Sequence, residues 1–424
     1  MNKWSKLTAL ASANLALTTV LVEGSLRILP TIIPADVLIH FEPTLRSQIA
    51  TGRFPTAKDA VGFKRTDGGF PFTLWKPFAE INYSFQDPGT VNTVRMDEIG
   101  FCNPPSTVYS EQSAFNVVAL GDSFIWCTTV RPEDTWVAQL ATVAKVSTYN
   151  LGHPGIGLYE YLRLLERYGL KKAPEVVVLN VYEGNDLRDA LRYHSYRQSG
   201  SAEQRVNLER TFGPLSRHSY AWNWLRAAIT PEIDPDASSD EPTDDSAPNE
   251  LKDGISEDDI NFRYDLSFKT NTVAFNPENG DRDEVVHAKR LAEGDISLDI
   301  FSDALKQFIQ LAKTHNFKPV VTYTPSAYTA YTDVVTFEQP ELSPIMSAFS
   351  QRQRNFFANQ SALLGFEFVD FTPGLQAAAP NHTTPETLLY YPTNRHLTKQ
   401  GHAVVAGILR YTIEENTRAA NPRS

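Results

Sequence analysis

The chain has 424 residues, 42% hydrophobic and 21% charged, which allows one large domain with additions or two domains around a full apolar core. Its 39 basic and 50 acidic side chains give a formal net charge of -11. This charge argues against a protein that binds nucleic acid through its phosphates. The acidic excess is local, because residues 232–259 contain twelve Asp or Glu and one Lys.

Cysteine and histidine are too sparse to suggest a metal site. Cys102 and Cys127 are the only cysteines, so they are either two unpaired thiols or one disulfide formed in an oxidising compartment. No helical metal-binding pair is found among the histidines, and His396 and His402 are six residues apart. We therefore expect neither a metal nor a cofactor.

The N-terminal segment, residues 1–29, has the character of an export signal. Lys3 and Lys6 precede residues 7–22, which carry no charge, and Glu23 follows. The run is short for a spanning helix of about 17–25 residues, and cleavage at residues 11–13 would leave too short an apolar core. An uncleaved signal anchor, a cleaved signal peptide and a buried helix remain open. The first two place the chain on the membrane facing the periplasm or the extracellular side, or make it secreted.

Residues 30–113 are rich in proline, glycine and aromatic residues. Residues 80–85 and 90–95 alternate in the way that short strands do. We predict an N-terminal β-rich extension that lies against a main domain spanning residues 114–424.

The main domain has the rhythm of a parallel α/β sheet. An apolar strand at residues 115–120 is followed by a helix from Pro132 to Val143, a strand at 146–151, a helix at 159–168 and a strand at 175–182. The pattern resumes with a helix at 298–315, a strand at 319–323, a helix at 344–363, a strand at 366–371 and a helix at 403–411. Between the two parts, residues 191–295 form a predicted insertion that contains a disordered acidic loop at 233–259.

Three loops at the predicted carboxyl ends of strands carry groups suited to catalysis. Ser123, in Gly121-Asp122-Ser123, could be a nucleophile near the positive end of a following helix, or it could simply cap that helix. The glycine-rich residues 150–157 could offer free N–H groups or serve only as a turn. Asn185 could complete an oxyanion hole or cap the next helix.

A histidine near the C-terminus could supply the base that a serine nucleophile needs. His396 is the favoured candidate and His402 the competing one, because an imidazole titrates near neutral pH. Taken alone, either could be an ordinary surface residue.

Together these pieces resemble, in order, the blocks of the SGNH, or GDSL-like, hydrolase superfamily. The matching pieces are Gly121-Asp122-Ser123, Gly155, Gly184-Asn185-Asp186 and His396. The resemblance implies a three-layer α/β/α flavodoxin-like fold. It also implies Ser123 as nucleophile, His396 as base and then acid, and an oxyanion hole formed by Ser123, Gly155 and Asn185. The N-terminus is similar to that of bacterial, membrane-anchored members.

The chain departs from the family pattern where an acid normally orients the histidine. The family usually has Asp two or three residues before the histidine, and here those positions hold Asn394 and Thr393. Asn394 could orient His396 by hydrogen bonding, or a backbone carbonyl could do so, leaving a Ser-His dyad.

Three functions are compatible with this sequence. The leading one is a serine-dependent hydrolase of an acyl ester of carbohydrate or lipid type. The second is an O-acyltransferase that modifies a cell-envelope polysaccharide, and the third is an inactive carbohydrate-binding protein with the same fold. In each case the expected partner is an acylated small molecule or glycan, with the membrane contacted through the N-terminus. The oligomeric state is left open.

Overall fold

The computed structural model describes residues 14, 18–29, 61–63, 72–74, 80–82, 87–91, 93–97, 99–104, 114–198, 215, 218–229, 262–276 and 282–420. The predicted acidic loop at 233–259 lies outside the described residues, as do most of residues 1–17. The domain boundaries given above stay predictions.

A five-stranded parallel sheet forms the centre of the protein. Its strands are β5 (Val117–Leu120), β6 (Thr148–Asn150), β7 (Val176–Tyr182), β10 (Lys318–Thr324) and β12 (Glu367–Asp370). They lie in the order β12-β10-β7-β5-β6. Numbered along the chain, this is the order 2-1-3-4-5 of flavodoxin-like sheets. Every residue of β5 and β7 is buried, as expected for central strands covered on both faces.

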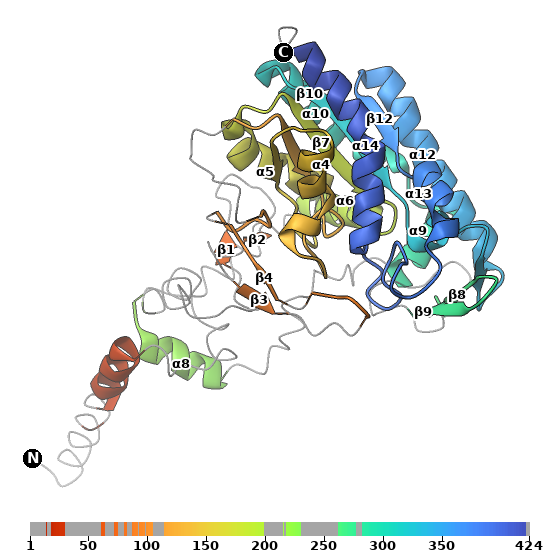
Figure 1. Cartoon of the computed structure of the whole chain (residues 1–424). Coiled ribbons are helices and arrows are strands. Elements are labelled where there is room, and N and C mark those ends of the chain that lie inside the picture. Colours follow the sequence, from red (N-terminus) through yellow and green to blue (C-terminus); the bar gives the residue numbers. More distant parts are fainter. Residues whose placement is uncertain are drawn as a thin grey trace, which may run out of the picture.

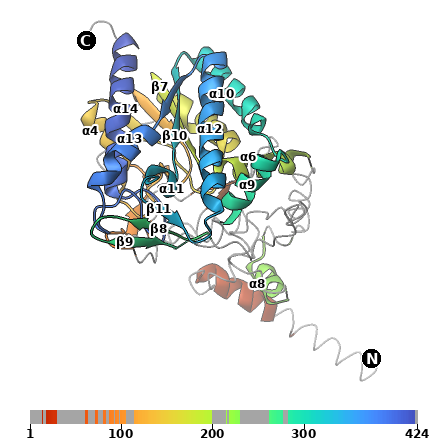
Figure 2. The same cartoon turned by 90° about the vertical axis from the view of Figure 1, so that its right-hand side faces the viewer.

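Helices cover both faces of the sheet, which confirms the predicted three-layer architecture (Figures 1 and 2). On one face α14 packs against α4 and α13, and on the other α10 packs against α5 and α12. Their bounds are α4 Trp136–Val143, α5 Leu158–Leu164, α10 Ser302–His315, α12 Leu342–Leu364, α13 Thr372–Ala378 and α14 Lys399–Ala420. Further α-helices in the described part of the chain include α6 Asp186–Gln198, α8 Tyr220–Ile229, α9 Arg282–Glu293 and α11 Ala327–Ala330.

Two predictions about helices were wrong. No helix begins at Ser123, because residues 122–130 form turns and a short 3-10 segment, Pro132–Asp134, precedes α4. The final helix is longer than residues 403–411. The Thr398 hydroxyl accepts the Gly401 N–H at 3.2 Å at its start, and an ion pair between Arg410 and Glu414 lies in its polar second half.

A small antiparallel sheet lies at one end of the main body. It consists of β11 (Val335–Phe337), β8 (Tyr264–Ser267) and β9 (Thr272–Phe275), in the order β11-β8-β9. The aromatic rings of Tyr264 and Phe275 stack with centroids 5.1 Å apart, and both side chains are buried in the main core. The described end of the predicted insertion therefore packs as part of the main body.

The N-terminal extension contains short antiparallel strands. The strands β1 (Val61–Phe63) and β2 (Phe72–Leu74) pair with each other, and so do β3 (Glu80–Asn82) and β4 (Thr93–Arg95). Cys102 and Cys127 form a disulfide, with Cα atoms 5.9 Å apart, so the second of the two alternatives for the cysteines is the one observed. This bond joins the extension to the loop that follows β5.

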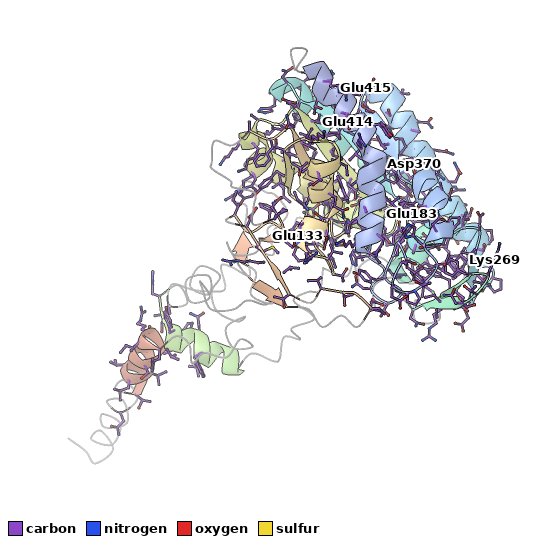
Figure 3. All side chains as sticks on the ribbon, viewed as in Figure 1. Glu133, Glu183, Lys269, Asp370, Glu414 and Glu415 are labelled. Atoms are coloured by element: carbon purple, nitrogen blue, oxygen red, sulfur yellow. A yellow bond between two sulfur atoms is a disulfide. The ribbon has the colours of Figure 1, made fainter. Side chains whose placement is uncertain are left out.

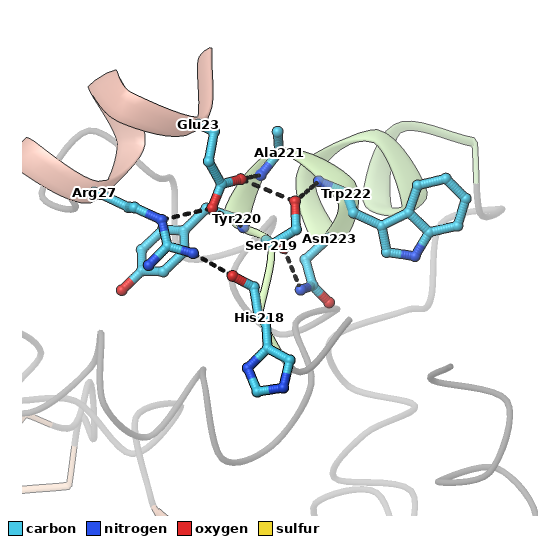
Figure 4. Close-up of polar contacts among 8 residues, drawn as sticks. All are labelled: Glu23, Arg27, His218, Ser219, Tyr220, Ala221, Trp222 and Asn223. Carbon is cyan, nitrogen blue, oxygen red and sulfur yellow. Dashed lines mark hydrogen bonds and ion pairs between the residues drawn. The ribbon is translucent and has the colours of Figure 1, made fainter. Parts of the chain in front are cut away.

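A helix at residues 18–28 lies beside α8 (Figures 1 and 4). The Glu23 carboxylate accepts the Ser219 hydroxyl at 2.9 Å and the Ala221 N–H at 2.8 Å, which caps the N-terminus of α8. Arg27 bonds to Glu23 at 2.6 Å and also to the carbonyl of His218. Among the described residues, no helix combines the length and apolar character that crossing a membrane requires.

The disulfide yields a test of stability. It closes a loop of 25 residues, so its removal is expected to lower the free energy of unfolding by about 3 kcal/mol through the entropy of the unfolded chain. Denaturant unfolding with and without reductant measures the change, and the double variant Cys102→Ala/Cys127→Ala is the control that reductant leaves unaffected. Alkylation of both thiols in the native, unreduced protein would contradict the bond.

Candidate active site

Ser123 is held in a tight turn directly after β5. The Asp122 carboxylate accepts the Phe124 N–H at 2.8 Å, and the Asp122 carbonyl accepts the Ile125 N–H at 3.3 Å. A Cβ atom on Gly121 would lie 3.0 Å from the Ile125 side chain, so glycine permits this close turn. Asp122 is buried while Ser123 is partly exposed, which leaves the serine hydroxyl at the surface of the loop.

The structure brings Ser123, His396 and Asn394 together in one chain of hydrogen bonds. The Ser123 Oγ atom lies 2.7 Å from His396 Nε2. On the other side of the ring, His396 Nδ1 faces Asn394 Oδ1 at 2.6 Å and the Asn394 carbonyl oxygen at 3.1 Å. Because a carbonyl oxygen can only accept, Nδ1 carries the proton and Nε2 accepts the serine hydroxyl. This is the tautomer that a general base for Ser123 requires.

Aromatic packing fixes the face of the imidazole. The Phe124 ring stacks on the His396 ring with centroids 4.9 Å apart, and it also stacks on the Tyr182 ring with centroids 3.5 Å apart. Tyr182 is the last residue of β7, so the central sheet supports the stack. Stacking therefore restrains the orientation of the imidazole plane, and hydrogen bonds restrain both ring nitrogens.

Burial lowers the pKa of His396 to about 4, with the Arg395 guanidinium acting in the same direction and the backbone contact to Asn394 against it. No carboxylate bonds to its Nδ1 to raise that pKa, since the partner is an amide. The imidazole is thus neutral at pH 7 and ready to accept a proton.

His402, the competing candidate for the base, has a structural role in α4. Its Nδ1 atom accepts the Trp136 N–H at 3.1 Å, which satisfies a backbone donor at the start of α4. Burial lowers the pKa of His402 to about 3, so the ring stays a neutral acceptor.

The three predicted oxyanion-binding residues follow three neighbouring strands. Ser123 follows β5, Gly155 follows β6 and Asn185 follows β7, and β5 lies between the other two in the sheet. Gly155 is exposed and has a φ of 74°, which favours glycine. Within the described residues the N–H groups of Ser123 and Gly155 have no acceptor, so both are available to a ligand. Their role in holding an oxyanion stays a prediction.

Buried polar contacts fix the loop that carries Asn185. The carboxylate of Glu183, labelled in Figure 3, accepts the hydroxyls of Thr329 at 2.6 Å and Ser350 at 2.9 Å. Burial raises the pKa of Asp122 to about 7, and the Phe124 N–H and the neighbouring Asn185 side chain act in the opposite direction. The loops after β5 and β7 therefore lie next to each other at this point.

Sequence reasoning missed two contributors to this site. The first is the stack of Phe124 and Tyr182, which no motif in the sequence indicates. The second is Asp87, whose carboxylate accepts the N–H of Thr393 at 2.9 Å and of Asn394 at 2.8 Å. No sequence signal could have paired these segments, which are about 306 residues apart.

Solved structures similar to this chain include two acetyl xylan esterases. One is AlAXEase, at 14% identity and a TM-score of 0.35, with 70% of this chain and 98% of that chain covered. The other is Axe2 from Geobacillus stearothermophilus, at 12% identity and a TM-score of 0.35, with 72% and 96% covered.

A third similar structure is a protein assigned to the G-D-S-L lipolytic family from Desulfitobacterium hafniense DCB-2. It has 12% identity, a TM-score of 0.33, and 70% and 97% of the two chains covered. No family model and no curated protein matches the chain. Similarity at this level transfers no substrate, so the function proposed below rests on the geometry around Ser123.

The low pKa of His396 yields a pH prediction. The neutral ring is the base, so labelling of Ser123 by a fluorophosphonate is expected to stay fast at pH 7 and to fall as the pH drops through about 4. In Asn394→Asp a carboxylate beside Nδ1 raises the pKa of His396, so the midpoint moves to higher pH while the rate at pH 7 is kept or raised. A large loss of labelling in Asn394→Asp would show that the role of Asn394 is misassigned.

Proposed function

We propose that the chain is a serine-dependent ester hydrolase that works through an acyl-enzyme. The distance of 2.7 Å between Ser123 Oγ and His396 Nε2 is the observation that carries the proposal. A serine bonded to a neutral, oriented imidazole is the arrangement of nucleophile and base that acyl transfer uses.

In the first half of the reaction Ser123 attacks the ester carbonyl. His396 Nε2 takes the hydroxyl proton as the Oγ–carbon bond forms, and the carbonyl oxygen becomes an oxyanion. The N–H groups of Ser123 and Gly155, with the side chain of Asn185, are the proposed donors to that oxyanion. His396 then returns the proton to the departing alkoxide, which leaves the acyl group on Ser123.

In the second half a water molecule replaces the alcohol. His396 takes a proton from the water, which attacks the acyl carbonyl, and then gives the proton back to Ser123 Oγ as the acid leaves. Asn394 keeps Nδ1–H in place throughout. An amide dipole stabilises the transient imidazolium less than a carboxylate would, so we expect slower turnover than a full triad gives.

For the substrate we propose an acyl ester of a carbohydrate or a lipid. The first half-reaction is the same for an O-acyltransferase, which differs only in passing the acyl group to a sugar hydroxyl in place of water.

We also propose that the chain is exported and held at the membrane by its N-terminal segment. The basic residues before the uncharged run, together with the disulfide, support this placement. A reporter that is active only outside the cytoplasm, fused after residue 29, should be active, and an inactive fusion would contradict export.

Loss of the nucleophile tests the proposed hydrolase. Ser123→Ala is expected to lower hydrolysis of an aryl acetate by about 1,000-fold or more, because no other group replaces the attacking oxygen. Ser347→Ala, at an exposed serine of α12, is the matched control and should keep wild-type activity. Unchanged hydrolysis in Ser123→Ala would refute the proposal.

The same assay with added sugars separates the hydrolase from the transferase. A hydrolase releases acetate at a rate that saccharide acceptors do not change. Transfer of the acetyl group to the sugar in preference to water would identify the transferase.

A further inference from the structure

The N-terminal extension contacts both loops that carry the catalytic pair. The Cys102–Cys127 disulfide and a bond from the Val91 N–H to the Thr129 carbonyl at 2.8 Å join it to the loop of Ser123. The Tyr391 hydroxyl donates to the Gly89 carbonyl at 3.2 Å, at the start of the loop of His396. The described residues between 87 and 104 therefore bridge two segments that come from distant parts of the chain.

Among these contacts, the hydrogen bonds of Asp87 reach the residues two and three positions before His396. Its carboxylate is buried, with only 7% of the residue exposed, and its two oxygens accept the N–H groups of Thr393 and Asn394 at 2.9 and 2.8 Å. Its own carbonyl accepts the Thr90 hydroxyl at 2.9 Å, which fixes the turn that presents it. Carboxylate bonds to backbone N–H groups are among the stronger hydrogen bonds in proteins.

The loop of His396 needs such support. It is closed by bonds from the Arg395 N–H to the Tyr391 carbonyl at 2.8 Å and from the Tyr391 N–H to the His396 carbonyl at 2.9 Å. Arg395, between Asn394 and His396, has a φ of 62°, a left-handed conformation that is costly for a residue with a side chain. Asp87 satisfies the two N–H groups just before that residue and so fixes the backbone of Asn394.

We propose that Asp87 is a positioning residue for the catalytic pair, holding Asn394 so that both of its oxygens face Nδ1 of His396. Its carboxylate acts on the backbone that carries the orienting amide, whereas the acid of a triad bonds to the imidazole itself. The inference rests on the proposed function, because it assigns Asp87 to the machinery of the same site.

The test replaces Asp87 by asparagine. The side-chain NH₂ group of asparagine cannot accept a hydrogen bond, so one of the two backbone N–H groups loses its acceptor. Asp87→Asn is expected to slow fluorophosphonate labelling of Ser123 by about 10- to 100-fold, because small misplacement of a catalytic group is costly. Nitrogen-15 NMR of the His396 ring should show a single Nδ1–H tautomer in the wild-type chain and a mixture in the variant. Asp87→Ser, which keeps one shorter acceptor, carries the same expectation if Asp87→Asn does not fold.

Asp97 provides a matched control in the same extension. It is also buried, and one of its oxygens accepts the N–H groups of Ile99, Gly100 and Phe101 at 2.8, 2.8 and 2.9 Å. Its other oxygen accepts the Asn103 side-chain N–H at 3.0 Å and the Tyr149 hydroxyl at 2.9 Å, and neither partner belongs to the loop of His396. Asp97→Asn should therefore lower stability while keeping the labelling rate and the single tautomer, below the unfolding temperature of each variant.

Wild-type labelling and a single tautomer in Asp87→Asn would overturn the inference. So would equal losses in Asp97→Asn, because they would mean that any loosening of the extension disturbs the site. Absence of labelling in the wild-type chain would instead refute the proposed function, and the tautomer measurement would still decide the role of Asp87.

Discussion

The imidazole of His396 is restrained on three sides, and the chemistry of the site depends on that restraint. Ser123 bonds to one ring nitrogen, Asn394 offers two oxygens to the other, and Phe124 stacks on the ring face. The backbone that carries each of these residues is fixed by other hydrogen bonds, such as those of Asp122 to Phe124 and of Asp87 to Asn394. Because a rotated ring could neither accept the serine proton nor return it, the surrounding loops act on the reaction through this one side chain.

The parallel sheet explains why these loops meet. The carboxyl ends of β5, β6 and β7 lie at the same edge of adjacent strands, so Ser123, Gly155 and Asn185 converge there although up to 62 residues separate them. The buried carboxylate of Glu183 then fixes the loop after β7 by accepting the hydroxyls of Thr329 and Ser350. The result is a site built on rigid strand ends and closed by a loop from near the C-terminus.

An amide in place of the usual acid gives the site a distinct electrostatic character. A carboxylate bonded to Nδ1 would favour the charged imidazolium, whereas Asn394 supplies only dipoles. Burial, helped by the charge of Arg395 and only partly opposed by the backbone contact to Asn394, lowers the pKa of His396 to about 4, so the base is neutral over a wide pH range. The arrangement avoids a buried ionised pair, and in exchange the imidazolium formed during the reaction receives weaker support.

The local sequence pattern predicts much of the fold and several loops of the candidate site. Apolar runs ending in polar loops predicted the central strands, their parallel direction and the loops that hold Ser123, Gly155 and Asn185, because such runs are typical of strands buried on both faces. The spacing of residues could not show that Asp87 bonds to Thr393 and Asn394, that Phe124 stacks with both Tyr182 and His396, or that Cys102 pairs with Cys127. Nor could it show that turns, and no helix, follow Ser123. These features depend on contacts between segments remote in the chain or on the competition between local turns and a helix, and only tertiary packing decides both.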